Sequence, residues 1–172
     1  MSIELCVPSL RETGAREAWL SDPETMRFNA DLPNDADGYD VATGCIRFEI
    51  TDWRFWRGVW LYHEPDRYSA FIRRDDGVFL GEVCYWFDPE TDAHRTGVIV
   101  QAKYRGQGVG TEALRLLTEH CFARDDIDTL QAELPADRDS AVRMYLANGY
   151  RETVSEGGVV RLEKKKIGSF GK

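Results

Sequence analysis

Cysteine is rare in this chain, and its placement argues against two classes of protein. Four cysteines are spread over 172 residues, and none stands in a C-x-x-C pair; they are Cys6, Cys45, Cys84 and Cys121. Small disulfide-stapled folds and zinc sites use paired or closely spaced cysteines. We therefore expect reduced thiols, no metal ion and a cytoplasmic protein.

Long apolar runs and an excess of positive charge are also missing. No run approaches the ~18 apolar residues that a membrane-spanning helix needs, and residues 1–4 do not begin a signal peptide. The 22 basic residues are outnumbered by 30 acidic ones, which gives a formal net charge of −8. The sequence therefore predicts no membrane association and no nucleic-acid partner, and it favours cationic partners.

The length and the absence of internal repeats fit a single domain. Alternating apolar residues predict strands over residues 3–7, 68–73, 78–87, 94–100, 129–134, 150–154 and 159–163, and helical spacing predicts helices over residues 14–20, 108–122 and 140–147. A short helix is expected at Pro23, directly after the N-cap residue Asp22. Residues 31–44 are rich in loop formers. The aromatic stretch over residues 46–62 has a period that fits a strand or a helix equally well. Together these elements predict an α/β (α+β) sandwich, with a mixed sheet and helices on both faces.

The most informative segment is an apolar strand pattern that leads through a glycine-rich turn into a helix. It reads Val98-Ile99-Val100-Gln101-Ala102-Lys103-Tyr104-Arg105-Gly106-Gln107-Gly108-Val109-Gly110-Thr111. Its three glycines let the backbone bend tightly with N–H groups turned inward. The helix adds free N-terminal N–H groups and the positive end of its dipole. The segment therefore predicts a cradle for a phosphate or diphosphate, with Arg105 at the rim to add charge.

Three phosphate-binding motifs compete for this turn. A P-loop has Gly-Lys-Ser/Thr after its glycines, whereas this chain has Gly110-Thr111-Glu112. A Rossmann fingerprint is G-x-G-x-x-G, but the spacing here is G-x-G-x-G and too few residues follow for a dinucleotide fold. The third motif is the acyl-CoA loop, Arg/Gln-x-x-Gly-x-Gly/Ala. Arg105, Gly108 and Gly110 fill it completely.

On these residues the chain resembles the GNAT superfamily of acyl-CoA N-acyltransferases, over about residues 79–165. The segment from Gly110 to Leu117 is similar to the branch of ribosomal-protein and polyamine acetyltransferases. The stretch from Ser140 to Tyr150 resembles the second motif of the family, a helix with a Tyr, followed by Gly and an aromatic residue. Where the family often has Asn, three residues before Ala141, this chain has Arg138.

The resemblance implies a fold, a co-substrate and the roles of several residues. The fold would be a mostly antiparallel sheet of about seven strands in one domain, with residues 1–66 on the acceptor side, 67–165 as the acyl-CoA-binding core and 166–172 as a tail. Acetyl-CoA would be held by Val98, Val100, Arg105, Gly106, Gln107, Gly108, Val109, Gly110 and Thr111. The strand before the loop would splay from its neighbour, and the Val100 N–H would stabilise the developing oxyanion. Tyr145 would be the general acid that protonates the leaving thiolate.

The general base has two candidates. His94 lies near the start of the strand that leads to the loop, where some family members carry a catalytic Glu or His, and its ordinary pKa suits a proton acceptor at neutral pH. Glu82, on the preceding strand, would act through water. Loss of the amine proton to bulk water, with no dedicated base, is the third route.

The aromatic segment from Trp53 to Tyr62, with Glu49, Asp52 and Glu64, falls where the family builds its acceptor pocket. Aromatic faces and carboxylates suit a cationic amine, although such residues also suit a core or a homodimer interface. The sequence thus predicts an N-acetyltransferase that moves an acetyl group from acetyl-CoA to a small cationic amine or a peptide amine by direct attack in a ternary complex. The alternative is an acyl-CoA-binding sensor or partner protein without turnover.

Overall fold

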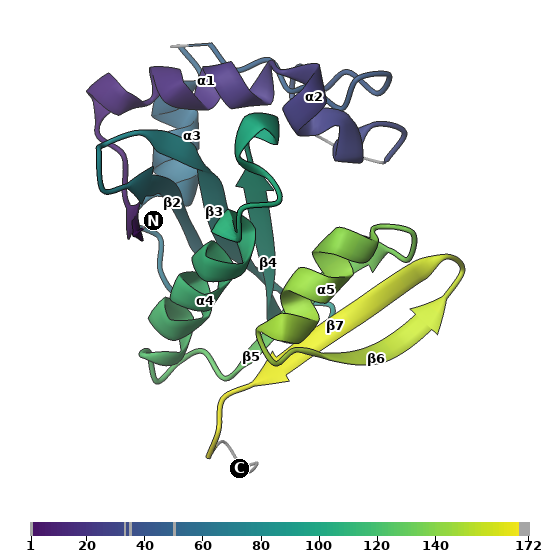
Figure 1. Ribbon diagram of the computed structural model, residues 1–172. Coiled ribbons are helices and arrows are strands. Elements are labelled where there is room, and N and C mark those ends of the chain that lie inside the picture. The colour runs from purple at the N-terminus through teal and green to yellow at the C-terminus, as the bar shows by residue number, and fades with distance from the viewer. Residues whose placement is uncertain (1, 33, 35, 50, 169–172) are drawn as a thin grey trace.

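Seven strands form one open sheet in the order β1-β2-β3-β4-β5-β7-β6 (Figure 1). The computed structural model describes residues 2–32, 34, 36–49 and 51–168. Every neighbouring pair of strands is antiparallel except β4 and β5, which run parallel. The strands are β1 (Ile3–Cys6), β2 (Arg67–Arg74), β3 (Phe79–Asp88), β4 (Ala93–Val100), β5 (Thr129–Pro135), β6 (Arg151–Glu156) and β7 (Val159–Lys165). The helices are α1 (Gly14–Leu20), α2 (Pro23–Met26), α3 (Trp53–Trp60), α4 (Val109–Phe122) and α5 (Asp139–Ala147), with 3-10 turns at Leu10–Glu12, Arg27–Asn29 and Ala102–Tyr104. The mixed, mostly antiparallel sheet is the predicted one.

The predicted elements are confirmed, with ends that shift by a residue or two. The Asp22 carboxylate caps α2 as expected and accepts the N–H groups of Glu24 and Thr25 at 3.2 Å each. The ambiguous aromatic stretch contains helix α3 in its second half, while residues 46–49 have no regular structure beyond one isolated bridge at Ile46. Within the expected loop 31–44, residues 33 and 35 lie outside the described residues.

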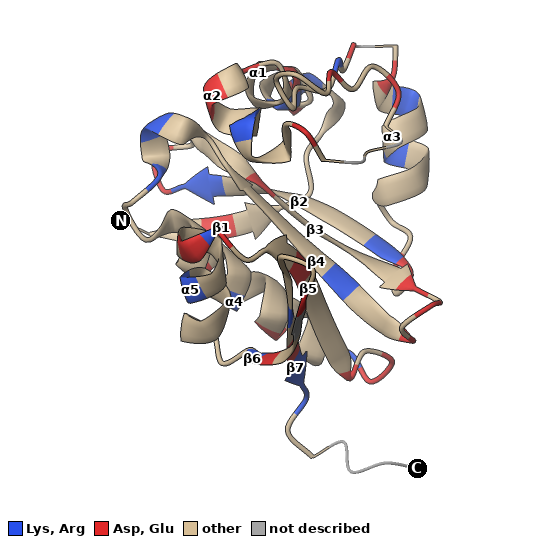
Figure 2. Ribbon diagram, turned by 90° about the vertical axis from the view of Figure 1, so that its right-hand side faces the viewer, with Lys and Arg blue, Asp and Glu red and all other residues tan. Residues whose placement is uncertain are grey.

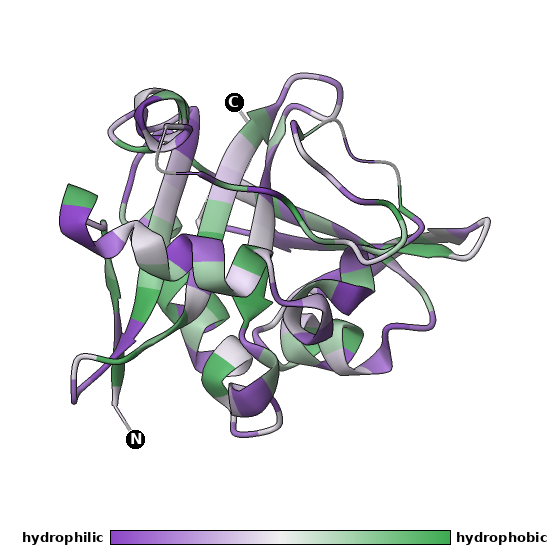
Figure 3. Ribbon diagram, turned by 90° about the horizontal axis from the view of Figure 1, so that it is seen from above, coloured by the Kyte–Doolittle hydropathy of each residue, from purple (hydrophilic) through white to green (hydrophobic). Residues whose placement is uncertain are grey.

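Helices cover both faces of the sheet, as predicted (Figures 1 and 3). Side chains alternate along β3, so that Val83 and Tyr85 belong to the core beneath α4 and α5. On the opposite face, Glu82 bonds to Arg16 of α1, and the Trp86 ring packs against Trp60 of α3. The protein therefore has two hydrophobic cores, one on each face of the sheet. An opening in the sheet can be lined by residues from both faces.

Charged residues of both signs are spread over helices, strands and loops (Figure 2). Within the described ranges, no helix is long and apolar enough to cross a membrane.

Strands β4 and β5 part soon after they meet. Their register pairs only His94 with Leu130 and Arg95 with Gln131. From residue 96 onward, β4 pairs with β3 alone among the described strands. An opening in the sheet therefore lies directly before the glycine-rich turn, which confirms the predicted splay.

A bulge in β3 brings its backbone against the end of β4. The register between β2 and β3 shifts at Leu80, and Gly81 follows with φ +154°. A Cβ atom on Gly81 would lie 2.0 Å from the carbonyl oxygen of Ile99. Glycine is required here because the neighbouring backbone occupies the space that any side chain would need.

We expect Gly81→Ala to lower the free energy of unfolding by at least about 2 kcal/mol, since β4 must move to accept the methyl group. Gly58→Ala is the matched control, because Gly58 lies inside α3 with open space where its Cβ would be. That change should leave stability unchanged or raise it by up to about 1 kcal/mol. Urea denaturation of both variants measures the difference, and equal stabilities would contradict the tight approach of β3 to β4.

Candidate active site

A cavity of about 1530 Å³ lies at the opening between β4 and β5. Its lining combines the glycine-rich turn and the start of α4 with residues of β3, β4 and all the other helices. Most of the predicted site residues contribute to it: Glu82, Val98, Val100, Arg105, Gly106, Gly108, Val109, Gly110, Thr111 and Tyr145. Of the predicted catalytic and CoA-binding residues, His94 and Gln107 do not line it.

Within the part of the chain that the structure describes, the first N–H groups of α4 have no hydrogen-bond acceptor, as the sequence predicts. Gly106 and Gly108 have φ values of +73° and +80°, and added Cβ atoms would meet nothing within 4 Å. Backbone conformation rather than space therefore calls for glycine at both positions. Gly108 is the N-cap of α4, and the first helical bond runs from the Glu112 N–H to the Gly108 carbonyl at 3.1 Å. The N–H groups before it, at the positive end of the helix dipole, suit an anion.

Gly110 has a different function from the two glycines before it. A Cβ atom there would lie 2.8 Å from the Met144 sulfur and 3.6 Å from a methyl group of Val100. This glycine therefore lets α5 and β4 pack closely against the first turn of α4.

The sequence predicts Arg105 at the rim of the cradle, but its side chain is held by carbonyl groups there. Its guanidinium donates to the carbonyl of Glu24 at 2.9 Å, to that of Val100 at 3.2 Å and to that of Thr25. Arg105 therefore fastens α2 to the turn, and burial lowers its pKa. Gln107 turns away from the cavity, because its amide donates to the Lys103 carbonyl at 3.1 Å.

The backbone of β4 presents two N–H groups to the opening. The Gln101 N–H donates to the Leu80 carbonyl of β3 at 2.9 Å. N–H groups alternate in direction along a strand, so those of Val98 and Val100 point away from β3, toward the gap beside β5. They are placed to bind a polar group that enters the gap.

Tyr145 reaches the same gap from α5. Its side chain is 2% exposed, and its hydroxyl lies 3.2 Å from both the Thr96 hydroxyl and the Thr96 carbonyl. Burial raises the pKa of Tyr145 to about 12. The phenol therefore keeps its proton at neutral pH.

Glu82 lies at the cavity, but most of its hydrogen-bonding capacity is in use. Its carboxylate accepts bonds from Arg16 Nε at 2.8 Å, Arg16 Nη2 at 3.2 Å and the Trp19 indole at 3.3 Å. The residue is 5% exposed. These three bonds leave few positions on the carboxylate for a further hydrogen-bond donor.

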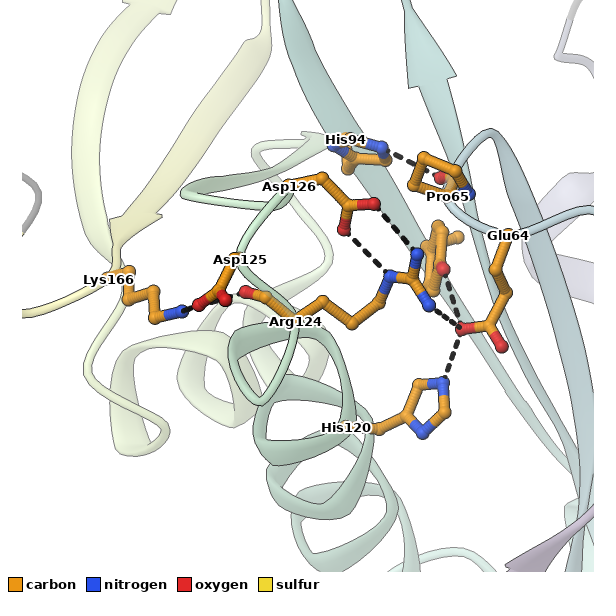
Figure 4. Close-up of polar contacts among 9 residues, drawn as sticks. Glu64, Pro65, His94, His120, Arg124, Asp125, Asp126 and Lys166 are labelled. Atoms are coloured by element: carbon orange, nitrogen blue, oxygen red, sulfur yellow. Dashed lines mark hydrogen bonds and ion pairs between the residues drawn. The ribbon is translucent and has the colours of Figure 1, made fainter. Parts of the chain in front are cut away.

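His94 lies at the other end of β4 and does not line the cavity. Its Nε2 atom is 2.9 Å from the Pro65 carbonyl (Figure 4), and Tyr85 and Phe87 pack around the ring. From His94 to Val100 the strand advances about 20 Å. The cavity is lined by the opposite part of β4, from Thr96 to Val100.

We expect His94→Gln to retain acetyl transfer but to change the dependence of stability on pH. Burial lowers the pKa of His94 below 6.5, so between the two values the unfolded chain binds a proton that the folded protein does not. The wild type should therefore lose stability as the pH falls below 6.5, and the variant should lose less. Urea denaturation on both sides of pH 6.5 tests this, and a variant with normal stability but no activity would instead support His94 as a base.

Helix α3 supplies only part of the predicted acceptor wall. The residues that line the cavity are Asp52, Phe55, Trp56 and Trp60. Trp53 and Tyr62 instead line a separate hollow beside Leu10. Glu64 lies on the other face of the sheet, where it accepts bonds from Tyr85 at 2.9 Å and from His120 at 2.6 Å (Figure 4).

A cluster of three arginines around Phe28, of which Arg105 and Arg138 line the cavity, was not predicted. Arg27, Arg105 and Arg138 lie 4.8, 4.9 and 5.5 Å from the centre of the Phe28 ring. Three like charges around one ring repel each other, and an anion would relieve that repulsion. Contacts between the 3-10 turn Arg27–Asn29, the glycine-rich turn and the residue before α5 are not visible in local sequence, although Arg138 departs from the family pattern. Among the described residues, no group of three acidic, cysteine or histidine side chains could hold a metal ion.

A model of the acetyltransferase (GNAT) family matches residues 36–150. Similar solved structures include the GNAT domain of S. lividans PAT, at 18% identity and TM-score 0.69, over 95% of this chain and 89% of that one. Spermidine N-acetyltransferase from Vibrio cholerae, in complex with CoA and spermine, has 10% identity and TM-score 0.72 over 95% of each chain. RimL, a ribosomal-protein N-acetyltransferase in complex with CoA, has 14% identity and TM-score 0.69 over 96% and 94%. No curated protein sequence matches the chain significantly.

The structural neighbours share the fold, and the family model covers more than half of the 172 residues. The chain therefore belongs to the GNAT family of acetyltransferases and is an acyl-CoA N-acyltransferase.

Proposed function

We propose that the enzyme moves an acetyl group from acetyl-CoA to a primary amine by direct attack in a ternary complex. One observation carries the proposal. The turn with its free N–H groups, the gap-facing N–H groups of Val98 and Val100, and the Tyr145 hydroxyl all line a single cavity. Solved neighbours named as acetyltransferases of spermidine and of a ribosomal protein hold CoA, which supports the same co-substrate here.

The turn would bind the diphosphate through the N–H groups of Gly108, Val109 and Gly110. The charges of Arg105 and Arg138 would add to the attraction of the phosphates. Val98 would hold the pantetheine arm, and the Val100 N–H would donate to the thioester oxygen as negative charge develops on it. One such donor is typically worth ~3 kcal/mol.

The amine nitrogen would attack the thioester carbon, forming a C–N bond as the C–S bond breaks. Tyr145 would give its proton to the departing sulfur. The proton lost by the amine would pass to water, directly or through a water molecule beside Glu82. His94 has no part in this scheme, because it does not reach the cavity.

The test is a thiol-release assay with acetyl-CoA and a panel of amines, in parallel with calorimetry of acetyl-CoA binding. We expect saturable binding and an amine-dependent release of one thiol for each acetylated product. Acetyl-CoA binding without amine-dependent release would identify a sensor and overturn the proposal.

A further inference from the structure

Arg16 lies against Trp56, one of the aromatic residues that the sequence predicts in the acceptor pocket. Its guanidinium carbon lies 4.7 Å from the centre of the Phe48 ring and 4.6 Å from that of Trp56. On the same group, Nε and Nη2 donate to the two oxygens of Glu82. Two aromatic faces and one carboxylate that line the cavity are thus already bound to a cation of the protein itself.

The charges that line the cavity also make it a poor site for a cationic acceptor. Five arginines and four acidic residues line it, in a protein whose formal net charge is −8. Two of these acids are paired, Glu82 with Arg16 at 2.8 Å and Glu133 with Arg161 at 2.9 Å. A polycation would find few free carboxylates there, and it would meet the charge of Arg16.

One edge of the Arg16 guanidinium can still donate hydrogen bonds to a ligand. Glu82 occupies the edge formed by Nε and Nη2, so the edge formed by Nη1 and the second hydrogen of Nη2 remains. No partner for that edge is found among the residues that the structure describes. The side chain is 14% exposed and lines the cavity. Two rings and a buried carboxylate hold it in place, and a fixed guanidinium edge matches a carboxylate with two parallel hydrogen bonds.

We propose that the acceptor is an amine that also carries a carboxylate and an apolar body, the chemistry of an apolar or aromatic amino acid. The proposal rests on the acetyl transfer proposed above. The carboxylate binds the open edge of Arg16, and the amine lies toward the gap between β4 and β5. The apolar body packs against Trp60 and Trp86, whose ring centres are 6.2 Å apart.

The first experiment compares L-phenylalanine, phenethylamine and spermidine as acceptors in the thiol-release assay, with kcat/KM corrected for the fraction of free amine. Phenethylamine differs from L-phenylalanine only by the carboxylate. We expect L-phenylalanine to exceed it by about tenfold to a hundredfold, the range for a charge-assisted pair of hydrogen bonds. Equal or faster reaction of phenethylamine or spermidine would overturn the proposal.

The second experiment removes the guanidinium edge of Arg16 and keeps its positive charge. Arg16→Lys should lower kcat/KM for L-phenylalanine by about tenfold or more and leave that for phenethylamine within about threefold, because an ammonium cannot form the fork. Arg54→Lys, on the exposed outer side of α3, is the matched control and should change neither value. An equal loss for both amines in Arg16→Lys would assign Arg16 to packing.

Binding separates this proposal from the proposed reaction. Calorimetry of L-phenylalanine with the CoA-bound protein should show saturable binding in the wild type and at least about tenfold weaker binding in Arg16→Lys. Such binding would support the carboxylate site even if no amine released thiol, a result that would overturn only the acetyl transfer. Absence of binding would overturn the carboxylate site, while thiol release by other amines would leave the transfer standing.

Discussion

Tyr145→Phe should lower kcat by ~10²-fold or more and leave acetyl-CoA affinity unchanged, because it removes the proton donor and keeps the ring. The ring is buried and packs edge-on against Tyr150 at 5.0 Å, so the fold should persist. Calorimetry gives the affinity, and the thiol-release assay gives kcat. Because the pKa of Tyr145 is raised to about 12, this residue should cause no change of kcat with pH near neutrality.

Tyr150→Phe is the matched control for this change. Tyr150 is equally buried, its hydroxyl lies 3.4 Å from that of Thr118, and it does not line the cavity. Its loss should leave kcat within a factor of about three. Similar activities for the two variants would show that Tyr145 only packs the core.

Gly108→Asp should weaken acetyl-CoA binding by about a hundredfold, since its carboxylate would repel the diphosphate at close range. Gly108→Asn is nearly isosteric, and both residues tolerate a positive φ. The amide variant should therefore bind far more tightly than the acid. Calorimetry at low and moderate salt measures the difference in acetyl-CoA affinity between the two variants, and this difference should become smaller as salt screens the charge. Equal affinities of the two variants would mean that the turn does not face the phosphates.

Local patterns were sufficient for most of the fold. Alternation predicted all seven strands, and the glycine-rich turn predicted where α4 begins, because both depend on neighbours in the sequence. The stretch over residues 46–62 stayed ambiguous, because its aromatic and apolar residues fit both the two-residue period of a strand and the period of a helix. Its helix is fixed by tertiary packing, in which Trp53 and Trp56 are buried against the sheet.

The site was harder to predict where it depends on long-range contacts. Glu82 and Arg16 are 66 positions apart in the sequence, and no local pattern indicates their ion pair. The same holds for Arg105, whose partners Glu24 and Thr25 on α2 are 81 and 80 positions away. His94 was placed on the right strand, but only the point at which β4 and β5 separate shows which end of that strand faces the cavity.

The binding of the diphosphate by the turn can be observed directly by nitrogen–proton NMR during a titration with acetyl-CoA. The amide signals of residues 106–111 should shift in a saturable way, with the affinity that calorimetry gives, while those of the β6–β7 hairpin tip stay in place. Unchanged signals from the turn in a protein that binds acetyl-CoA would mean that the diphosphate lies elsewhere.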